Sequence, residues 1–167
     1  MLEKLRGRAI KYGHNINTDL IIPARYCINI DEEELSRHCM EDLDVDFLEK
    51  MEIGDVLIAG ENFGCGSSRE AAPMAIKGAK LSCVVASSFA RIFFRNAINI
   101  GLPIFESKEA YESIENGDLL EIFPENNLII NLTKEEEYKS TIFPPIIREV
   151  ISKGGMVNFV RERLKQL

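Results

Sequence analysis

A strand, a glycine-rich turn and a helix follow one another directly between residues 55 and 76, and this unit constrains the fold more than any other stretch. The apolar run 55–59 predicts a buried strand, and the run 71–76 predicts a helix. Gly64 and Gly66, in the turn, allow backbone conformations closed to other residues and a close approach to a ligand. Together with the strands and helices that follow, the unit predicts an α/β fold.

The turn also carries functional groups, because Ser67, Ser68 and Arg69 lie at the start of the predicted helix of about 68–76. The first N–H groups of a helix favour negative charge, and an arginine offers a forked donor to a carboxylate or phosphate. The pattern predicts an anion site with a basic or nucleophilic hydroxyl. The alternative is that the glycines only turn the chain and that Ser67 or Ser68 is a helix N-cap. The turn matches neither a phosphate loop, a GxGxxG fingerprint nor a GxSxG elbow.

The alternation of strands and helices extends to both sides of this unit. On the N-terminal side we expect a strand at 7–12, a polar loop at 13–19, a helix at 32–40 capped by Asp31, and a half-ordered acidic linker at 41–52. On the C-terminal side we expect a strand at 81–86, a helix at 89–98 capped by Ser87 and Ser88, a hairpin of 119–123 with 128–132, a solvated edge at 134–137, and helices at 145–152 and 156–165.

Length and charge exclude several classes of protein. With 167 residues, the chain is expected to be a single domain, 1–167. Its net charge of −7 argues against nucleic acid as a partner. The N-terminus has no apolar core typical of a signal peptide, and no uncharged run reaches the ~18 residues of a membrane span, so we expect a cytoplasmic protein without membrane contact.

The potential metal ligands are few and scattered. The four cysteines contain no CxxC pair and the two histidines are far apart in sequence, so we expect no metal site in this chain. His38, in the acidic helix, is expected to be a solvated surface residue, and His14 lies in a loop where a ligand contact is open. The roles of Arg91 and Arg95, four residues apart, are also open: subunit contact, pairing within the domain, or the site.

Three segments resemble, in order and spacing, the small subunits of 3-isopropylmalate dehydratase and their relatives in the aconitase superfamily. They are Asn17–Pro23, Gly60–Glu70 and Ser88–Leu102. The resemblance covers nearly the whole chain. It implies a three-layer β/β/α swivelling domain that docks on a large subunit carrying a [4Fe-4S] cluster. It also implies a hydro-lyase reaction, in which a small 2-hydroxy di- or tricarboxylate is dehydrated and then rehydrated at the adjacent carbon, with activity only in the complex.

The resemblance also assigns roles to residues. Ser67 would be the base that removes the proton from carbon, and Ser68 and Arg69 would bind a substrate carboxylate. Thr18 and Asp19 match positions that line the pocket, with Asp19 orienting Arg69 or another donor rather than reacting. The iron of the partner's cluster would act as the Lewis acid on the substrate.

The loop after Pro23 matches the one that meets the variable end of the substrate in this superfamily. Here it reads Tyr26, Cys27, Ile28 and Asn29, with no cation beyond Arg25. Burying an unpaired carboxylate would be costly, so the loop favours an apolar substituent and points to 3-isopropylmalate and leucine biosynthesis. Citramalate, 2,3-dimethylmalate and homocitrate remain alternatives, as one methyl group separates substrates by only ~1–3 kcal/mol. A different class, a stand-alone anion-binding regulatory module, also remains open.

Overall fold

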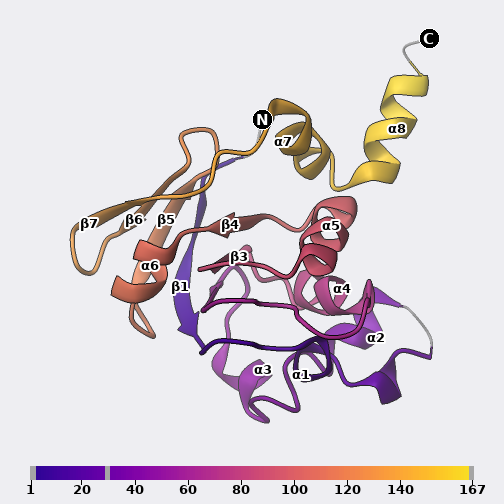
Figure 1. The fold of residues 1–167 in the computed structure, drawn as a ribbon, viewed down its shortest axis with the longest axis horizontal. Helices are drawn as coiled ribbons and strands as arrows, with labels where there is room; N and C mark the ends of the chain where they lie inside the picture. Colours follow the sequence, from indigo (N-terminus) through magenta and orange to yellow (C-terminus); the bar gives the residue numbers. More distant parts are fainter. Residues whose placement is uncertain (1–2, 29–30, 166–167) are drawn as a thin grey trace.

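A seven-stranded mixed sheet forms the centre of the molecule in the computed structural model, which describes residues 3–28 and 31–165 (Figure 1). The strand order is β4-β3-β2-β1-β5-β6-β7. The pairs from β4 to β1 are parallel, and those from β1 to β7 are antiparallel. The strands are β1 (Leu5–Lys11), β2 (Val56–Ala59), β3 (Cys83–Ala86), β4 (Ile104–Glu106), β5 (Leu119–Phe123), β6 (Leu128–Asn131) and β7 (Glu136–Lys139).

Strand β1 belongs to both halves of this sheet. Its first part pairs antiparallel with β5, with Leu5 opposite Ile122, and its last part pairs parallel with β2, with Ala9 opposite Val56. All residues of β2 and β3 are buried, as expected of parallel strands covered on both faces. In β5 and β6 burial alternates with a period of two, so one face of the predicted hairpin packs on the core.

The helices pack in connected groups around the sheet. α1, α2 and α5 all contact α4, α5 also contacts α7 and α8, and α6 lies against β3 and β7 (Figure 1). The helices are α1 (Thr18–Ile21), the 3₁₀ turn Ala24–Tyr26, α2 (Glu32–Ser36), α3 (Phe47–Lys50), α4 (Ala71–Gly78), α5 (Arg91–Ile100), α6 (Lys108–Ser113), α7 (Pro145–Ser152) and α8 (Met156–Leu164). No helix within 3–28 and 31–165 is long and apolar enough to cross a membrane.

Some predicted helix boundaries are wrong. α2 has the predicted cap, since the Asp31 carboxylate accepts from the Glu34 N–H at 3.0 Å, but the helix ends at Ser36. α5 begins at Arg91 without a side-chain cap. The Ser88 hydroxyl instead accepts a hydrogen bond from the Asn62 N–H at 2.9 Å, so this serine connects two loops.

The segment 41–52 is not a half-ordered linker, as predicted, but contains α3 and a core residue. Phe47 is 0% exposed and lies 6.2 Å from the ring of Tyr12. The Asp44 carboxylate accepts from the Tyr12 hydroxyl at 2.8 Å and from Lys50 Nζ at 2.7 Å. These contacts attach the acidic segment to the end of β1.

Asp44→Asn is expected to destabilise the fold in a pH-dependent way. The hydrogen bond from Lys50 and, less strongly, that from Tyr12 lower the pKa of Asp44. A carboxyl whose folded pKa is lowered stabilises the protein above its unfolded pKa, and this contribution is lost as the pH falls through the folded pKa. We expect a loss of about 1–2 kcal/mol in the free energy of unfolding at pH 7.

Urea unfolding at pH 7 and pH 3 measures this effect. The difference between Asp44→Asn and the wild type should shrink at pH 3. Asp46→Asn is the matched control, because its carboxylate lies 3.7 Å from Lys50 and is 59% exposed. We expect a change within about 0.5 kcal/mol for this surface substitution. Equal losses for Asp44→Asn at the two pH values would contradict the ionic role.

Candidate active site

The loops that carry the predicted site meet at one edge of the sheet, where β1, β2 and β3 all end. The loop after β1 pairs with the loop after β2, through Gly60 N–H to Gly13 C=O at 2.9 Å and an isolated parallel bridge of Asn17 with Cys65. A second bridge joins Phe63 to Phe89, which follows β3. The carboxyl edge of parallel strands is where open α/β sheets bind ligands.

Gly64 allows the turn after β2 to lie directly on the aromatic core. Its φ is +78°, and a Cβ there would lie 2.2 Å from Cγ of Phe93. Phe93 is 1% exposed and packs edge-on against Phe63, with ring centroids 5.1 Å apart. The backbone leading to the serines is therefore supported by packed aromatic rings.

Gly64→Ala is expected to lower the free energy of unfolding by about 2–4 kcal/mol, from the left-handed conformation and the overlap with Phe93 together. Gly117→Ala is the matched control, because Gly117 has a φ of +90° but open space around its Cα. It should cost only the conformational part, about 1–2 kcal/mol. Chemical unfolding of both variants measures the difference, and equal losses would refute the packing argument.

Thr18 lies beneath the turn and connects it to the first loop. Its N–H donates to Cys65 C=O at 2.8 Å, and its hydroxyl donates to Ser67 C=O at 3.1 Å. Thr18 is only 2% exposed, at the start of α1, which Asn17 caps by accepting from Leu20 N–H at 3.0 Å. These contacts make Thr18 a support of the Ser67 backbone, and its place on the wall of the pocket stays a prediction.

Ser67 and Ser68 are both exposed. The alternative that one of them caps the helix is wrong, because α4 begins after Glu70 and has no side-chain cap. Among the residues that the structure describes, neither hydroxyl has a hydrogen-bond partner, and the backbone N–H groups of Ser67, Ser68 and Arg69 have no acceptor. Three successive backbone donors and two hydroxyls are therefore available to an anionic ligand.

Arg69 and Asp19 form an ion pair across the two loops. Arg69 Nη1 donates to Asp19 Oδ1, and the Arg69 side chain is 20% exposed against 57% for Asp19. The contact brings Asp19 and Arg69 together, and the orienting role of Asp19 stays a prediction. Nε and Nη2 of Arg69 have no partner in the described part of the chain, so the guanidinium can still bind a carboxylate in a bidentate manner.

His14, whose ligand contact was left open, has a structural role. Its Nδ1 accepts from the Glu61 N–H at 2.9 Å, and its Nε2 lies 3.2 Å from the Tyr111 hydroxyl. Because Nδ1 accepts, the ring in this arrangement carries its proton on Nε2. The absence of a side chain at Gly60 leaves room for the ring, as a Cβ there would lie 2.5 Å from Nδ1.

The loop after Pro23 begins with a 3₁₀ turn over Ala24–Tyr26. Tyr26 and Cys27 are half-buried, and Cys27 Sγ lies 3.6 Å from Pro23 C=O. Ile28 is 86% exposed, so an apolar side chain is available at this position. The fourth residue predicted for this loop, Asn29, lies outside the described residues.

The structure corrects the expectation for His38 and narrows the open roles of Arg91 and Arg95. His38 is not simply solvated, because it stacks on Tyr26 with ring centroids 3.6 Å apart. Sequence reasoning missed this contact because it placed His38 in a helix, whereas the residue lies in the turn after α2, which ends at Ser36. Arg91 and Arg95 are exposed and make no ion pair with any residue in 3–28 or 31–165. These two arginines therefore pair with no carboxylate in the described part of the chain.

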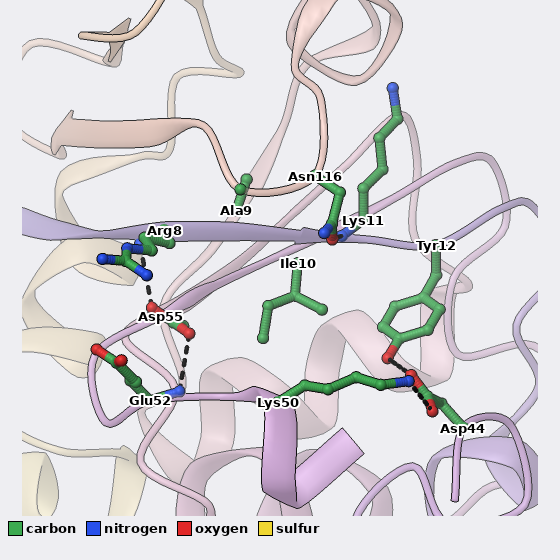
Figure 2. A pocket seen from close by; sticks show the side chains of 11 residues that line it. Arg8, Ala9, Ile10, Lys11, Tyr12, Asp44, Lys50, Glu52, Asp55 and Asn116 are labelled. Carbon is green, nitrogen blue, oxygen red and sulfur yellow. Dashed lines mark hydrogen bonds and ion pairs between the residues drawn. The ribbon is translucent and has the colours of Figure 1, made fainter. Parts of the chain in front are cut away.

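A cavity of about 410 Å³ lies along β1, away from these loops (Figure 2). Its polar groups largely pair with one another, as the dashed contacts in Figure 2 show. Asp55 accepts from the N–H groups of Arg8 and Glu52, at 3.1 and 2.8 Å, and Asp44 accepts from the Tyr12 hydroxyl. None of the residues 60–70 lines it. The cavity is therefore not the predicted anion site.

The described residues do not fit an iron–sulfur cluster. They contain no group of three or more His, Cys, Asp or Glu side chains placed to hold a metal ion. Clusters are bound by cysteine thiolates. Cys39 and Cys83 are fully buried, and burial raises the pKa of both thiols, that of Cys83 to about 12. No step of the chemistry is therefore assigned to a metal on this chain.

Comparison with known proteins places the chain in a family. The Aconitase C-terminal domain family matches residues 15–109. A 3-isopropylmalate dehydratase small subunit from Caldanaerobacter subterraneus subsp. tengcongensis is 56% identical over 161 residues, 96% of this chain and 100% of that protein. Another with the same name, from Clostridium beijerinckii, is 54% identical over 95% of this chain and 99% of its own length.

A solved structure agrees with these sequence matches. The crystal structure of 3-isopropylmalate dehydratase from Methanocaldococcus jannaschii superposes with a TM-score of 0.93 at 43% identity, covering 98% of both chains. It confirms the predicted α/β fold of the aconitase small-subunit type. This chain belongs to the family of 3-isopropylmalate dehydratase small subunits, within the aconitase superfamily.

Proposed function

We propose that this chain is the small subunit of a hydro-lyase that converts 2-isopropylmalate into 3-isopropylmalate by dehydration and rehydration, a reaction of leucine biosynthesis. The proposal rests on the backbone N–H groups of residues 67–69, which have no acceptor in the described part of the chain. They occur in a chain that is 56% identical to a 3-isopropylmalate dehydratase small subunit. A substrate of this kind has two carboxylates, and one of them matches these donors in charge and shape.

Ser67 is the base that removes the proton from carbon. A serine hydroxyl is a very weak acid, so its alkoxide needs fixed donors around it and little water. The N–H groups next to Ser67 and the start of α4 supply positive electrostatic potential. Thr18 holds the Ser67 carbonyl at 3.1 Å and so limits the positions that the hydroxyl can take.

Arg69 and Ser68 bind a substrate carboxylate. Asp19 pairs with one nitrogen of the Arg69 guanidinium and leaves the others for the ligand. The carboxylate would then replace water rather than a protein group. This arrangement uses Asp19 to orient Arg69 and gives it no part in proton transfer.

The active site is completed by a large subunit. The exposed position of Ser67 and Ser68 is consistent with half of a site that a second chain covers. The [4Fe-4S] cluster belongs to that large subunit, where it would act as the Lewis acid on the substrate. This chain supplies the base, the carboxylate donors and the loop at 26–28.

The loop composition supports an apolar substituent on the substrate. Ile28 is exposed and uncharged, and Arg25, the cation of this loop, is paired with Glu41 and Asp42. A third substrate carboxylate would find no unpaired partner on Arg25 and would be costly to bury. These contacts favour 2-isopropylmalate over homocitrate.

Reconstitution with the large subunit tests the function. The complex should act on 2-isopropylmalate with a higher kcat/KM than on citramalate, 2,3-dimethylmalate or homocitrate, and this chain alone should be inactive. Calorimetric titration of the isolated chain with phosphate and malate distinguishes the stand-alone alternative. Tight anion binding without a partner, together with an inactive complex, would favour a regulatory module.

A further inference from the structure

One carboxylate, that of Glu41, accepts hydrogen bonds from three side chains of the loop after Pro23 and of the turn after α2. Its Oε1 accepts from Arg25 Nη2 at 3.0 Å and from the Tyr26 hydroxyl at 2.9 Å, and its Oε2 lies 2.7 Å from His38 Nδ1. We call Arg25, Tyr26, His38, Glu41 and Asp42 the Glu41 cluster. The cluster joins the loop after Pro23 to a segment about 15 residues further along the chain.

The rings and the guanidinium of the cluster are also in contact with each other. The Tyr26 and His38 rings stack at 3.6 Å with an interplanar angle of 5°, and the Arg25 guanidinium lies 4.7 Å from the Tyr26 centroid. Tyr26 is therefore held both by its hydroxyl and by its ring. Because Tyr26 is fixed in this way, the backbone of the adjacent Cys27 has little freedom to move.

Asp42 completes the binding of Arg25. Its two oxygens accept from Arg25 Nη1 at 2.9 Å and from Nη2 at 2.6 Å, a bidentate pair. Hydrogen bonds from His38, Tyr26 and Arg25 lower the pKa of Glu41, and the bond from Arg25 lowers that of Asp42, so both carboxylates are charged at neutral pH. Two negative charges thus face the single positive charge of Arg25.

We propose that Glu41 is a positioning residue for substrate recognition, which fixes Arg25 and Tyr26 so that the loop presents the uncharged Cys27 and Ile28 to the variable end of the substrate. The proposal rests on the proposed function for the identity of the substrate. It adds a residue outside the loops at the carboxyl edge of the sheet. It also explains how a loop containing an arginine can favour an apolar group.

Glu41→Gln tests the proposal, because the amide keeps the shape of the side chain but loses the charge and one acceptor. In the reconstituted complex, KM for 2-isopropylmalate should rise about tenfold, with kcat within twofold of the wild type, as expected for the loss of a charged hydrogen bond that positions the substrate. Glu33→Gln is the matched control: its carboxylate, 81% exposed, pairs with Arg37 outside the cluster, and KM should not change.

Hydrogen exchange of the isolated full chain gives a second readout that needs no activity. The amides of Tyr26 and Cys27 donate to Pro23 and Ala24 C=O, each at 3.0 Å. Glu41→Gln should speed their exchange about tenfold, a shift corresponding to the same lost hydrogen bond. Exchange at β2 should not change.

The outcomes separate this inference from the proposed function. Unchanged KM and unchanged exchange in Glu41→Gln would overturn the positioning role. A variant Glu41→Gln that loses kcat, fails to assemble and exchanges faster throughout the chain would also overturn the positioning role. Glu41 would then stabilise the fold as a whole. A wild-type complex inactive on 2-isopropylmalate would refute the proposed function, while faster exchange at Tyr26 and Cys27 alone would still support the control of the loop by Glu41.

Discussion

Ser67→Ala is expected to lower kcat of the reconstituted complex by about 10²–10⁴-fold, the usual contribution of a positioned general base. The substitution removes only the hydroxyl, which has no hydrogen-bond partner in the described part of the chain. The fold and the backbone donors of the turn should therefore persist. KM should change little, because the carboxylate still meets Arg69 and the N–H groups of the turn.

Steady-state kinetics on 2-isopropylmalate, with size-exclusion chromatography of the complex, measures this effect. Ser68→Ala provides the comparison, since it removes a hydroxyl proposed to bind substrate and should mainly raise KM. A variant Ser67→Ala with turnover near that of the wild type would remove Ser67 from the role of base. Loss of assembly would instead assign Ser67 to the subunit interface.

The central sheet could be predicted from the sequence because its signals are local. The runs that became β2 and β3 are continuously apolar, which is typical of strands buried on both faces. The hairpin of β5 and β6 has alternating residues around a turn at 124–127. The role of β1 in both halves of the sheet could not be derived, because pairing with two distant strands leaves no periodic pattern in seven residues.

Errors in the helix starts have a common physical cause. A serine before an apolar stripe can cap a helix or bind elsewhere, and the sequence does not distinguish the two. Ser88 lies three residues before α5 begins at Arg91, yet its hydroxyl accepts from the N–H of Asn62, 26 residues away. The acidic segment 41–52 was misread for a different reason: Phe47 is its one fully buried residue, and Leu43 and Met51 pack on the core while only partly buried, so its apolar signal is weak.

The candidate site was predictable only in part. Ser67, Ser68 and Arg69 are adjacent in sequence, so their proximity needs no tertiary information. The contact of Arg69 with Asp19 spans 50 residues and was expected only from the resemblance to a family. Glu41 carried no signal at all, because a single glutamate in an acidic run does not indicate which cation it will meet.

Arg69→Lys is expected to raise KM for 2-isopropylmalate about 10- to 100-fold, as two charge-assisted hydrogen bonds to the substrate carboxylate are replaced by one. A lysine keeps the positive charge but has no planar fork, so it cannot bind Asp19 and a carboxylate in the same bidentate arrangement. Because the carboxylate is bound both before and during proton removal, most of the loss should appear in KM rather than in kcat.

Asp19→Asn shows whether the orientation of Arg69 matters beyond its charge. The amide oxygen can still accept from Arg69 Nη1, but the attraction is weaker, so KM should rise less than in Arg69→Lys. If Asp19 were instead the base, Asp19→Asn would lower kcat as strongly as Ser67→Ala. An unchanged KM in Arg69→Lys would remove Arg69 from the carboxylate site and leave the Ser68 hydroxyl and the N–H groups of residues 67–69 as its remaining donors. The two variants therefore separate charge, orientation and proton transfer within one ion pair.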